Sequence, residues 1–159
     1  MSSEIDGETK EERMRQIQEW HMKCLKKHGW YAHFVPDESF PLGMNIHTHG
    51  LLEGDLHLHH LDLQIVLPLQ PEVAQGVLHA VTAKIKGGKV FQDGEKYDGI
   101  LKAGFLVAFA KALEGERIVL RIILPDPDGK IDKAEMDPDY ARQYDGLFKG
   151  IDGEPLSSN

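Results

Sequence analysis

The stretch LDLQIVLPLQPEVAQGVLHAVTAKIKGG, residues 61–88, decides the fold because it joins a predicted strand to a predicted helix. The first part has apolar residues at every second position, the period of a strand with one apolar face: Leu61, Leu63, Ile65 and Leu67. The second part starts with Pro71, which suits a first helical turn, and ends at Gly87-Gly88. Between them runs an apolar stripe at helical spacing, made of Val73, Ala74, Val77, Leu78, Val81 and Ile85.

The flanking sequence predicts one more main helix, one short helix and four more strands. Residues 9–29 open with Thr9, an N-cap residue followed three positions later by Glu12, and close at a glycine, which predicts a helix. Two alternating stretches upstream, WYAHFVP (30–36) and MNIHTHG (44–50), predict strands. Downstream, GFLVAFAKAL (104–113) and ERIVLRIILP (116–125) predict a hairpin, and a short helix is expected near 138–148.

The predicted order of elements is α-β-β-β-α-β-β. Strands follow one another with one crossover helix, which favours an α+β fold over a doubly wound parallel sheet. We therefore expect a single α+β domain over residues 9–151, with a mainly antiparallel or mixed sheet of about five strands and two main helices. The polar ends, residues 1–8 and 152–159, are predicted to be flexible tails.

Composition excludes several classes of function. The chain has 159 residues and a net charge of −8 without any long basic run, so nucleic acid is not an expected partner. No apolar run approaches the roughly 20 residues that cross a bilayer, so no membrane association is expected. The polar N-terminus and the single Cys24 make a cytoplasmic location the default. A homo-oligomer is possible, since the hairpin over 104–124 is a candidate edge or dimer contact.

A cluster of histidines precedes the stretch over 61–88. Alternate residues of a strand share a face, so His47 and His49 project together, and His60 and Asp62 lie on the polar side of the next strand. If residues 54–55 formed a two-residue turn, His49 would lie opposite His60, and His47 opposite Asp62.

This grouping suggests a metal site. Three imidazoles and one carboxylate are ligands that Zn, Fe, Ni or Mn sites use, with His57 and His59 as secondary candidates. One hypothesis is a metal-dependent enzyme, hydrolytic or oxygen-using. The alternative is a non-catalytic module whose polar cluster, without metal, binds a small-molecule ligand or a partner. A solvated polar surface without any role is a third interpretation.

Several motifs resemble the bacterial family called domain of unknown function 4262. GWYAHFVPDESFP, THGL, HLDLQIVLPL and LRIILPD follow the order and spacing of that family over residues 28–124. Thr48-His49-Gly50-Leu51 fits its Thr-Val-Gly-Leu motif, and His60-Leu61-Asp62-Leu63 fits its His-Pro-Glu-Leu motif. The connection between the two motifs is some three residues longer here, which favours a loop over a two-residue hairpin. The resemblance implies the fold outline and no activity.

Two further patterns have simpler explanations than metal binding. His21, Cys24 and His28 share one helix face, but Met14 and Ile17 lie on it as well, which favours packing against the sheet. Residues 124–135 match part of a calcium loop, yet Leu124 occupies its first position and a strand precedes it. A turn after a strand is the better interpretation.

Overall fold

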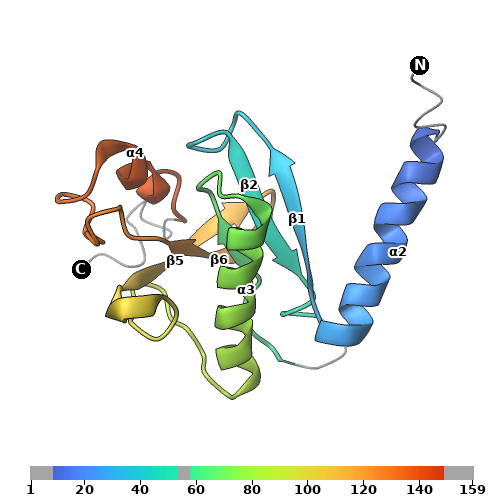
Figure 1. Cartoon of the computed structure of the whole chain (residues 1–159), viewed down its shortest axis with the longest axis horizontal. Helices are drawn as coiled ribbons and strands as arrows, with labels where there is room; N and C mark the ends of the chain where they lie inside the picture. Colours follow the sequence, from blue (N-terminus) through green and yellow to red (C-terminus); the bar gives the residue numbers. More distant parts are fainter. Residues whose placement is uncertain (1–8, 54–57, 149–159) are drawn as a thin grey trace.

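The sheet has six strands in the order β1-β2-β3-β6-β5-β4. The computed structural model describes residues 9–53 and 58–148. The strands are β1 Tyr31–Pro36, β2 Met44–His49, β3 Leu63–Ile65, β4 Lys96–Tyr97, β5 Val107–Glu114 and β6 Arg117–Ile123. The helices are α2 Lys10–His28, α3 Pro71–Lys86 and α4 Pro138–Ala141, with short 3-10 turns η1 Lys102–Gly104 and η2 Arg142–Tyr144 (Figure 1).

The α+β prediction is confirmed, with two corrections to the sheet. It contains six strands instead of about five, because β4 has only two residues, too few to produce an alternating pattern. All neighbouring strands pair antiparallel except β3 and β6, which are parallel. Since β6 lies between β3 and β5, the predicted hairpin is largely internal to the sheet.

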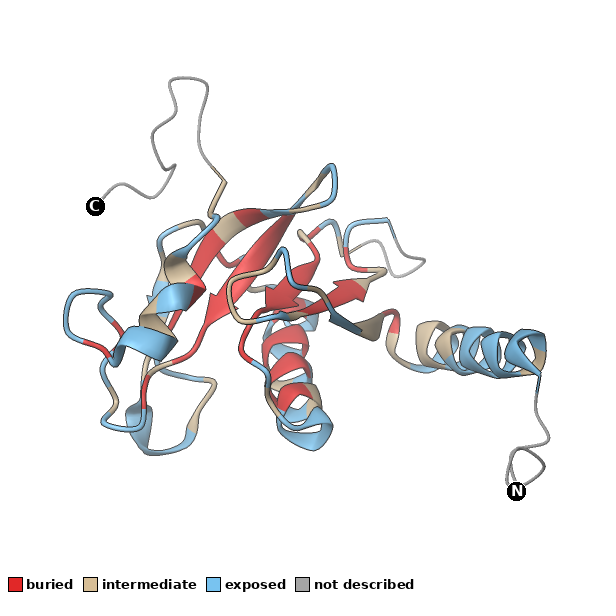
Figure 2. Ribbon diagram, turned by 90° about the horizontal axis from the view of Figure 1, so that it is seen from above, coloured by how far each residue is buried: buried red, intermediate tan, exposed pale blue. Residues whose placement is uncertain are grey.

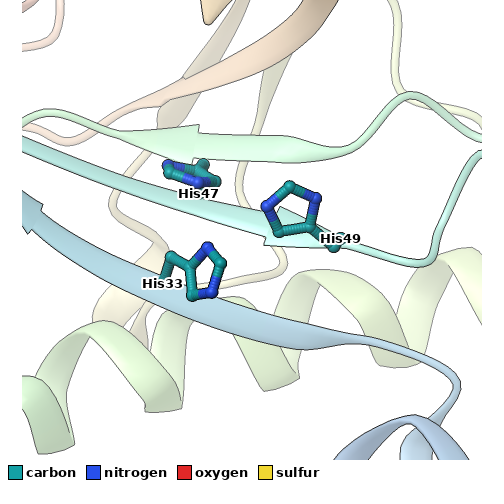
Figure 3. Close-up of side chains that lie close together, drawn as sticks. All are labelled: His33, His47 and His49. Atoms are coloured by element: carbon teal, nitrogen blue, oxygen red, sulfur yellow. The ribbon is translucent and has the colours of Figure 1, made fainter. Parts of the chain in front are cut away.

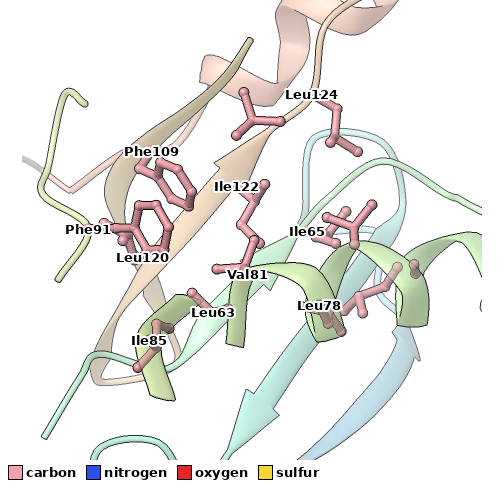
Figure 4. Packing of buried hydrophobic residues seen from close by; sticks show 14 of the residues in the cluster. Leu63, Ile65, Leu78, Val81, Ile85, Phe91, Phe109, Leu120, Ile122 and Leu124 are labelled. Atoms are coloured by element: carbon pink, nitrogen blue, oxygen red, sulfur yellow. The ribbon is translucent and has the colours of Figure 1, made fainter. Parts of the chain in front are cut away.

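One face of the sheet packs against α3 and forms the main core. Leu63 and Ile65 of β3, with Leu120 and Ile122 of β6, project towards the helix and are at most 1% exposed. The predicted stripe of α3 meets them through Ala74, Val77, Leu78, Val81 and Ile85, and Figure 4 labels the last three of these. Val73 is exposed. Burying such side chains contributes roughly 1.5–3 kcal/mol each, so this interface holds the domain together.

The opposite face of the sheet carries an apolar cluster at one end, a buried arginine next to it and histidines at the other end. At the β5 and β6 end, a smaller apolar cluster of Ala108, Ala110, Ile123 and Ile131 lies under the C-terminal segment. Next to it, the buried Arg121 donates hydrogen bonds to Gln64 and to the backbone oxygens of Gln143 and Asp145. At the β1 and β2 end, the same face carries histidines.

Helix α2 begins and ends as its sequence predicts. Thr9 Oγ1 accepts a hydrogen bond from the Glu12 amide at 3.0 Å, and Gly29 ends the helix in the left-handed conformation. None of its residues is buried, and its N-terminal half extends away from the sheet (Figures 1 and 2). The predicted packing of its apolar face therefore holds for the last turns alone.

Gly50 is expected to be intolerant of a side chain. It follows β2 with φ +111°, and a Cβ there would lie 2.5 Å from the Gly29 carbonyl oxygen. We expect Gly50→Ala to lower the free energy of unfolding by about 2 kcal/mol. Gly76 is the matched control, because it lies exposed within α3 with open space around it, so Gly76→Ala should stabilise the protein slightly. Urea denaturation of both variants checks this, and an equal response would contradict it.

Candidate metal centre

Three histidines from two neighbouring strands converge on one face of the sheet. In the β1–β2 pair, His33 lies directly opposite His47, and Tyr31 opposite His49. Because the side-chain period of a strand is two, all four side chains project from the same face. Figure 3 shows His47 and His49 on one strand and His33 reaching towards them from the next.

The spacing of these imidazoles, the histidine triad, suits one metal ion. One ring nitrogen from each of His33, His47 and His49 lies within 4.8 Å of the others. The ring centroids are 5.3 Å apart for His33–His47, 4.9 Å for His33–His49 and 5.0 Å for His47–His49. Two imidazoles on one tetrahedral ion, with metal–nitrogen bonds of about 2.1 Å, have centroids about 5 Å apart. Small side-chain movements would therefore bring three nitrogens onto one ion.

The triad is held in the neutral form that metal ligands require. Burial lowers the pKa of His47 to about 4, although nearby Glu114 acts to raise it. Burial also lowers the pKa of His33 and of His49, with neighbouring histidine or arginine charges adding to the effect. At neutral pH the three imidazoles thus offer nitrogen lone pairs without first losing a proton.

The two ring nitrogens of His47 have different surroundings. Nδ1 is buried without a hydrogen-bond partner among the described residues, which is costly for a polar atom unless something binds it. Nε2 lies 4.0 Å from Glu114 Oε1, and Arg117 holds that carboxylate by a hydrogen bond of 2.7 Å. Although burial acts to raise the pKa of Glu114, Arg117 and His47 lower it overall, so the carboxylate is charged. A carboxylate behind a metal-binding histidine typically orients the ring and increases its basicity.

A cleft of about 760 Å³ opens beside His49. Its polar lining comes from Tyr31, His49, Glu53, Asp62, Glu116 and Arg117, and its apolar lining from Leu25, Leu52, Leu61 and Ile118. Arg117 is fixed within it by hydrogen bonds to Glu114 and to the Thr48 carbonyl oxygen. The triad is therefore next to a space that can hold a small molecule.

The structure groups His47 and His49 with His33 rather than with His60 and Asp62. His60 Nε2 accepts a hydrogen bond from the Phe91 amide at 3.1 Å, and its Nδ1 lies 2.8 Å from the Leu61 carbonyl oxygen. Those partners imply a neutral ring protonated on Nδ1, with both nitrogens engaged.

Asp62 likewise has a structural role. Its Oδ1 accepts hydrogen bonds from the Thr48 hydroxyl at 2.8 Å and from the Leu51 amide at 3.1 Å. Arg117 lies 3.4 Å from its other oxygen. Burial nevertheless raises the pKa of this carboxyl group, against the effect of these hydrogen bonds. Asp62 lines the cleft and joins the ends of β2 and β3.

The pairing register explains the difference. His47 lies opposite Gln64, two positions further along than the partner that a two-residue turn would supply. The segment between β2 and β3 is thus a loop, as predicted, and not a two-residue hairpin turn. His57, a secondary candidate ligand, lies outside the described residues. His59 is exposed and has a positive φ of 55°, outside the triad. His33 is a candidate ligand that the sequence did not single out. Alternation puts it on one face of β1 with Tyr31, whereas its position opposite His47 depends on the pairing of β1 with β2.

Neither of the two other sequence patterns brings three candidate ligand atoms together within residues 9–53 and 58–148. His21 stacks on Tyr31 and contacts His33, whereas His28 contacts Trp30 and His79. In the calcium-like stretch, Asp126 accepts hydrogen bonds from the amides of Asp128, Lys130 and Asp137, so the predicted turn is confirmed.

Burial of neutral His47 makes the metal-free protein sensitive to acid. Its pKa is about 4 in the folded state and 6.5 in a model compound, so between these values the unfolded chain binds more protons. The contribution of neutral His47 to the free energy of unfolding is therefore complete above about pH 6.5. It falls by about 3 kcal/mol as the pH drops towards 4. Urea denaturation in chelator at several pH values checks this. His47→Asn should reduce the slope, and an identical slope in the variant would contradict the prediction.

Comparisons with known proteins do not assign a function. Comparison with protein-family models, with curated proteins and with solved structures gave no match. The resemblance to domain of unknown function 4262 therefore stays a prediction. Among the described residues, no helix is long and apolar enough to cross a membrane.

Proposed function

We propose that this chain is a metal-dependent hydrolase whose ion is bound by His33, His47 and His49. The observation that carries the proposal is the convergence of three neutral imidazoles beside a cleft of about 760 Å³. Catalytic zinc sites use three protein ligands and leave the fourth position to water or substrate, whereas structural sites use four. The bound ion would lower the pKa of that water to about 7 and so supply hydroxide at neutral pH.

The donor set favours hydrolysis over oxygen chemistry. Non-haem iron oxygenases typically use two histidines and one carboxylate, and here the converging ligand atoms are three imidazole nitrogens. Three neutral nitrogens suit zinc, a borderline-soft ion, and leave its full positive charge to polarise water.

Charged residues around the triad have supporting roles in this proposal. Glu114 faces His47, and Arg117 positions both Glu114 and Asp62. The cleft presents Glu53 and Glu116 as carboxylates that can accept a proton from water or bind a polar group of the substrate.

The test is metal content followed by catalysis. Protein purified without a histidine tag should contain or take up one zinc ion per chain, and chelator should lower its melting temperature. Zinc-loaded protein should hydrolyse an activated ester faster than the same zinc concentration with His49→Ala. Absence of stoichiometric binding would overturn the proposal. Binding without hydrolysis of any ester, amide or phosphoester probe would favour the non-catalytic binding module.

A further inference from the structure

The cleft next to the triad has an excess of acidic side chains. Three of the described charged residues that line it are acidic and one is basic: Glu53, Asp62, Glu116 and Arg117. The Arg117 guanidinium is already engaged, because its Nε donates a hydrogen bond of 2.7 Å to Glu114. Even when the buried Asp62 is counted as neutral, the lining therefore has a net negative charge from two carboxylates.

These two carboxylates are accessible to a ligand. Glu53 and Glu116 are exposed, and neither forms an ion pair within residues 9–53 and 58–148. Since Asp62 is 5% exposed, it lies deeper in the cleft, and the exposed carboxylates lie at its mouth. Carboxylates without a partner at the mouth of a cleft attract cations and repel anions.

Each of these carboxylates is close in sequence to an apolar side chain of the same cleft. Leu52, adjacent to Glu53, is 43% exposed, and Ile118, two positions after Glu116, is 36% exposed. Exposed apolar side chains in a space of this size contribute affinity when a ligand covers them. A matching ligand thus has both a positive charge and an apolar group.

We propose that the substrate is an amphipathic cation: an ester or amide whose positive charge is bound by Glu53 and Glu116 and whose apolar part contacts Leu52 and Ile118. The proposal rests on the hydrolase function proposed above, which assigns cleavage to the triad. In water, a carboxylate about 7 Å from a bound cation increases its affinity about threefold, so the two carboxylates together give a preference of about tenfold over an uncharged analogue.

The first test compares two esters of the same shape on the zinc-loaded full chain. Acetylcholine is the cationic ester, and a tert-butyl group replaces its trimethylammonium group in the uncharged analogue. Hydrolysis of either ester consumes one water and yields acetate, a proton and an alcohol, so proton release measures both reactions. We expect kcat/KM to be about tenfold higher for acetylcholine in dilute buffer, and the preference to fall below about twofold in about 0.5 M sodium chloride.

Two double variants test the assignment of the charges. Glu53→Gln with Glu116→Gln should bring the preference close to one, because it removes both charges with little change of shape. Taking the ratio of the two esters cancels any effect of these residues on the chemical step. Glu38→Gln with Glu72→Gln is the matched control, since both residues are exposed and outside the cleft. Its preference should stay within about twofold of the wild type, because salt screens distant charges.

Binding of the alcohols separates this proposal from the hydrolase. Choline should bind the full chain about tenfold more tightly than its tert-butyl analogue, with or without zinc, in an NMR titration. Preferred binding of choline without hydrolysis of either ester would overturn the hydrolase and leave the charge preference of the cleft in place. Equal hydrolysis of both esters would overturn the cationic substrate and leave the hydrolase. Equal binding of the two alcohols, or equal loss of the preference in both double variants, would also overturn the cationic substrate.

Discussion

Replacing His33 with alanine is expected to weaken zinc binding more than about a hundredfold. Loss of a group that merely orients a ligand costs about 10–100-fold in affinity, and His33 is one of the three converging residues proposed as the ligands themselves. Two histidines from one strand, His47 and His49, would remain, and two ligands bind zinc far more weakly than three. Isothermal titration of tag-free protein with zinc measures the affinity.

The matched control for His33→Ala is His79→Ala. His79 lies exposed on α3 next to His28 and Trp30, outside the triad, so zinc affinity should stay within about twofold of the wild type. His60→Ala gives a sharper contrast. It removes the acceptor of the Phe91 amide and should lower stability while leaving one zinc bound at neutral pH. Equal loss of zinc in His33→Ala and His79→Ala would refute the triad.

Replacing Arg121 with methionine is expected to lower the free energy of unfolding by about 4 kcal/mol. Arg121 is 1% exposed, and its guanidinium donates to Gln64 Oε1, to the Gln143 carbonyl oxygen and to the Asp145 carbonyl oxygen. Removing one member of such a buried network leaves its partners without hydrogen bonds, at a cost of about 3–5 kcal/mol. Burial lowers the pKa of Arg121 to about 10, so it remains charged at neutral pH.

Urea denaturation of Arg121→Met checks this effect. Arg142→Met serves as the control because it makes the same chemical change on a side chain that is 54% exposed, where an ion pair contributes about 0–1 kcal/mol. Similar stability of the two variants would contradict the role assigned to Arg121. We further expect the loss to loosen the C-terminal segment first, since Gln143 also binds the Leu124 backbone.

The elements could be predicted because each depends on a local pattern. Thr9 and Gly29 are the N-cap and C-cap residues that mark the two ends of α2. The apolar stripe of Val77, Leu78 and Val81 indicates α3, and the alternation of Leu63 and Ile65 indicates β3. Local propensity and side-chain period are short-range properties, so they are visible along the chain. The two-residue β4 lacks any such period, and the parallel pairing of β3 with β6 joins segments that are remote in sequence.

The site could be predicted in part. Strand alternation puts His47 and His49 together, and the structure confirms that they share a face. Their third neighbour depends on which strand lies beside β2 and in what register. Pairing with β1 brings His33 opposite His47, while the two-position shift on the β3 side separates His60 and Asp62 from them.

The sequence by itself determined the helices, five of the strands, the α3 side of the core and the two histidines of β2. Tertiary structure alone decided that His33 completes the triad, that His60 and Asp62 bind backbone groups, and that Arg117 links Glu114 to Asp62 beside the cleft. The physical reason is that a side chain's face is set by its own strand, whereas its neighbours are set by strand order and register. Those depend on the burial of the whole sheet against α3 and on the loop between β2 and β3.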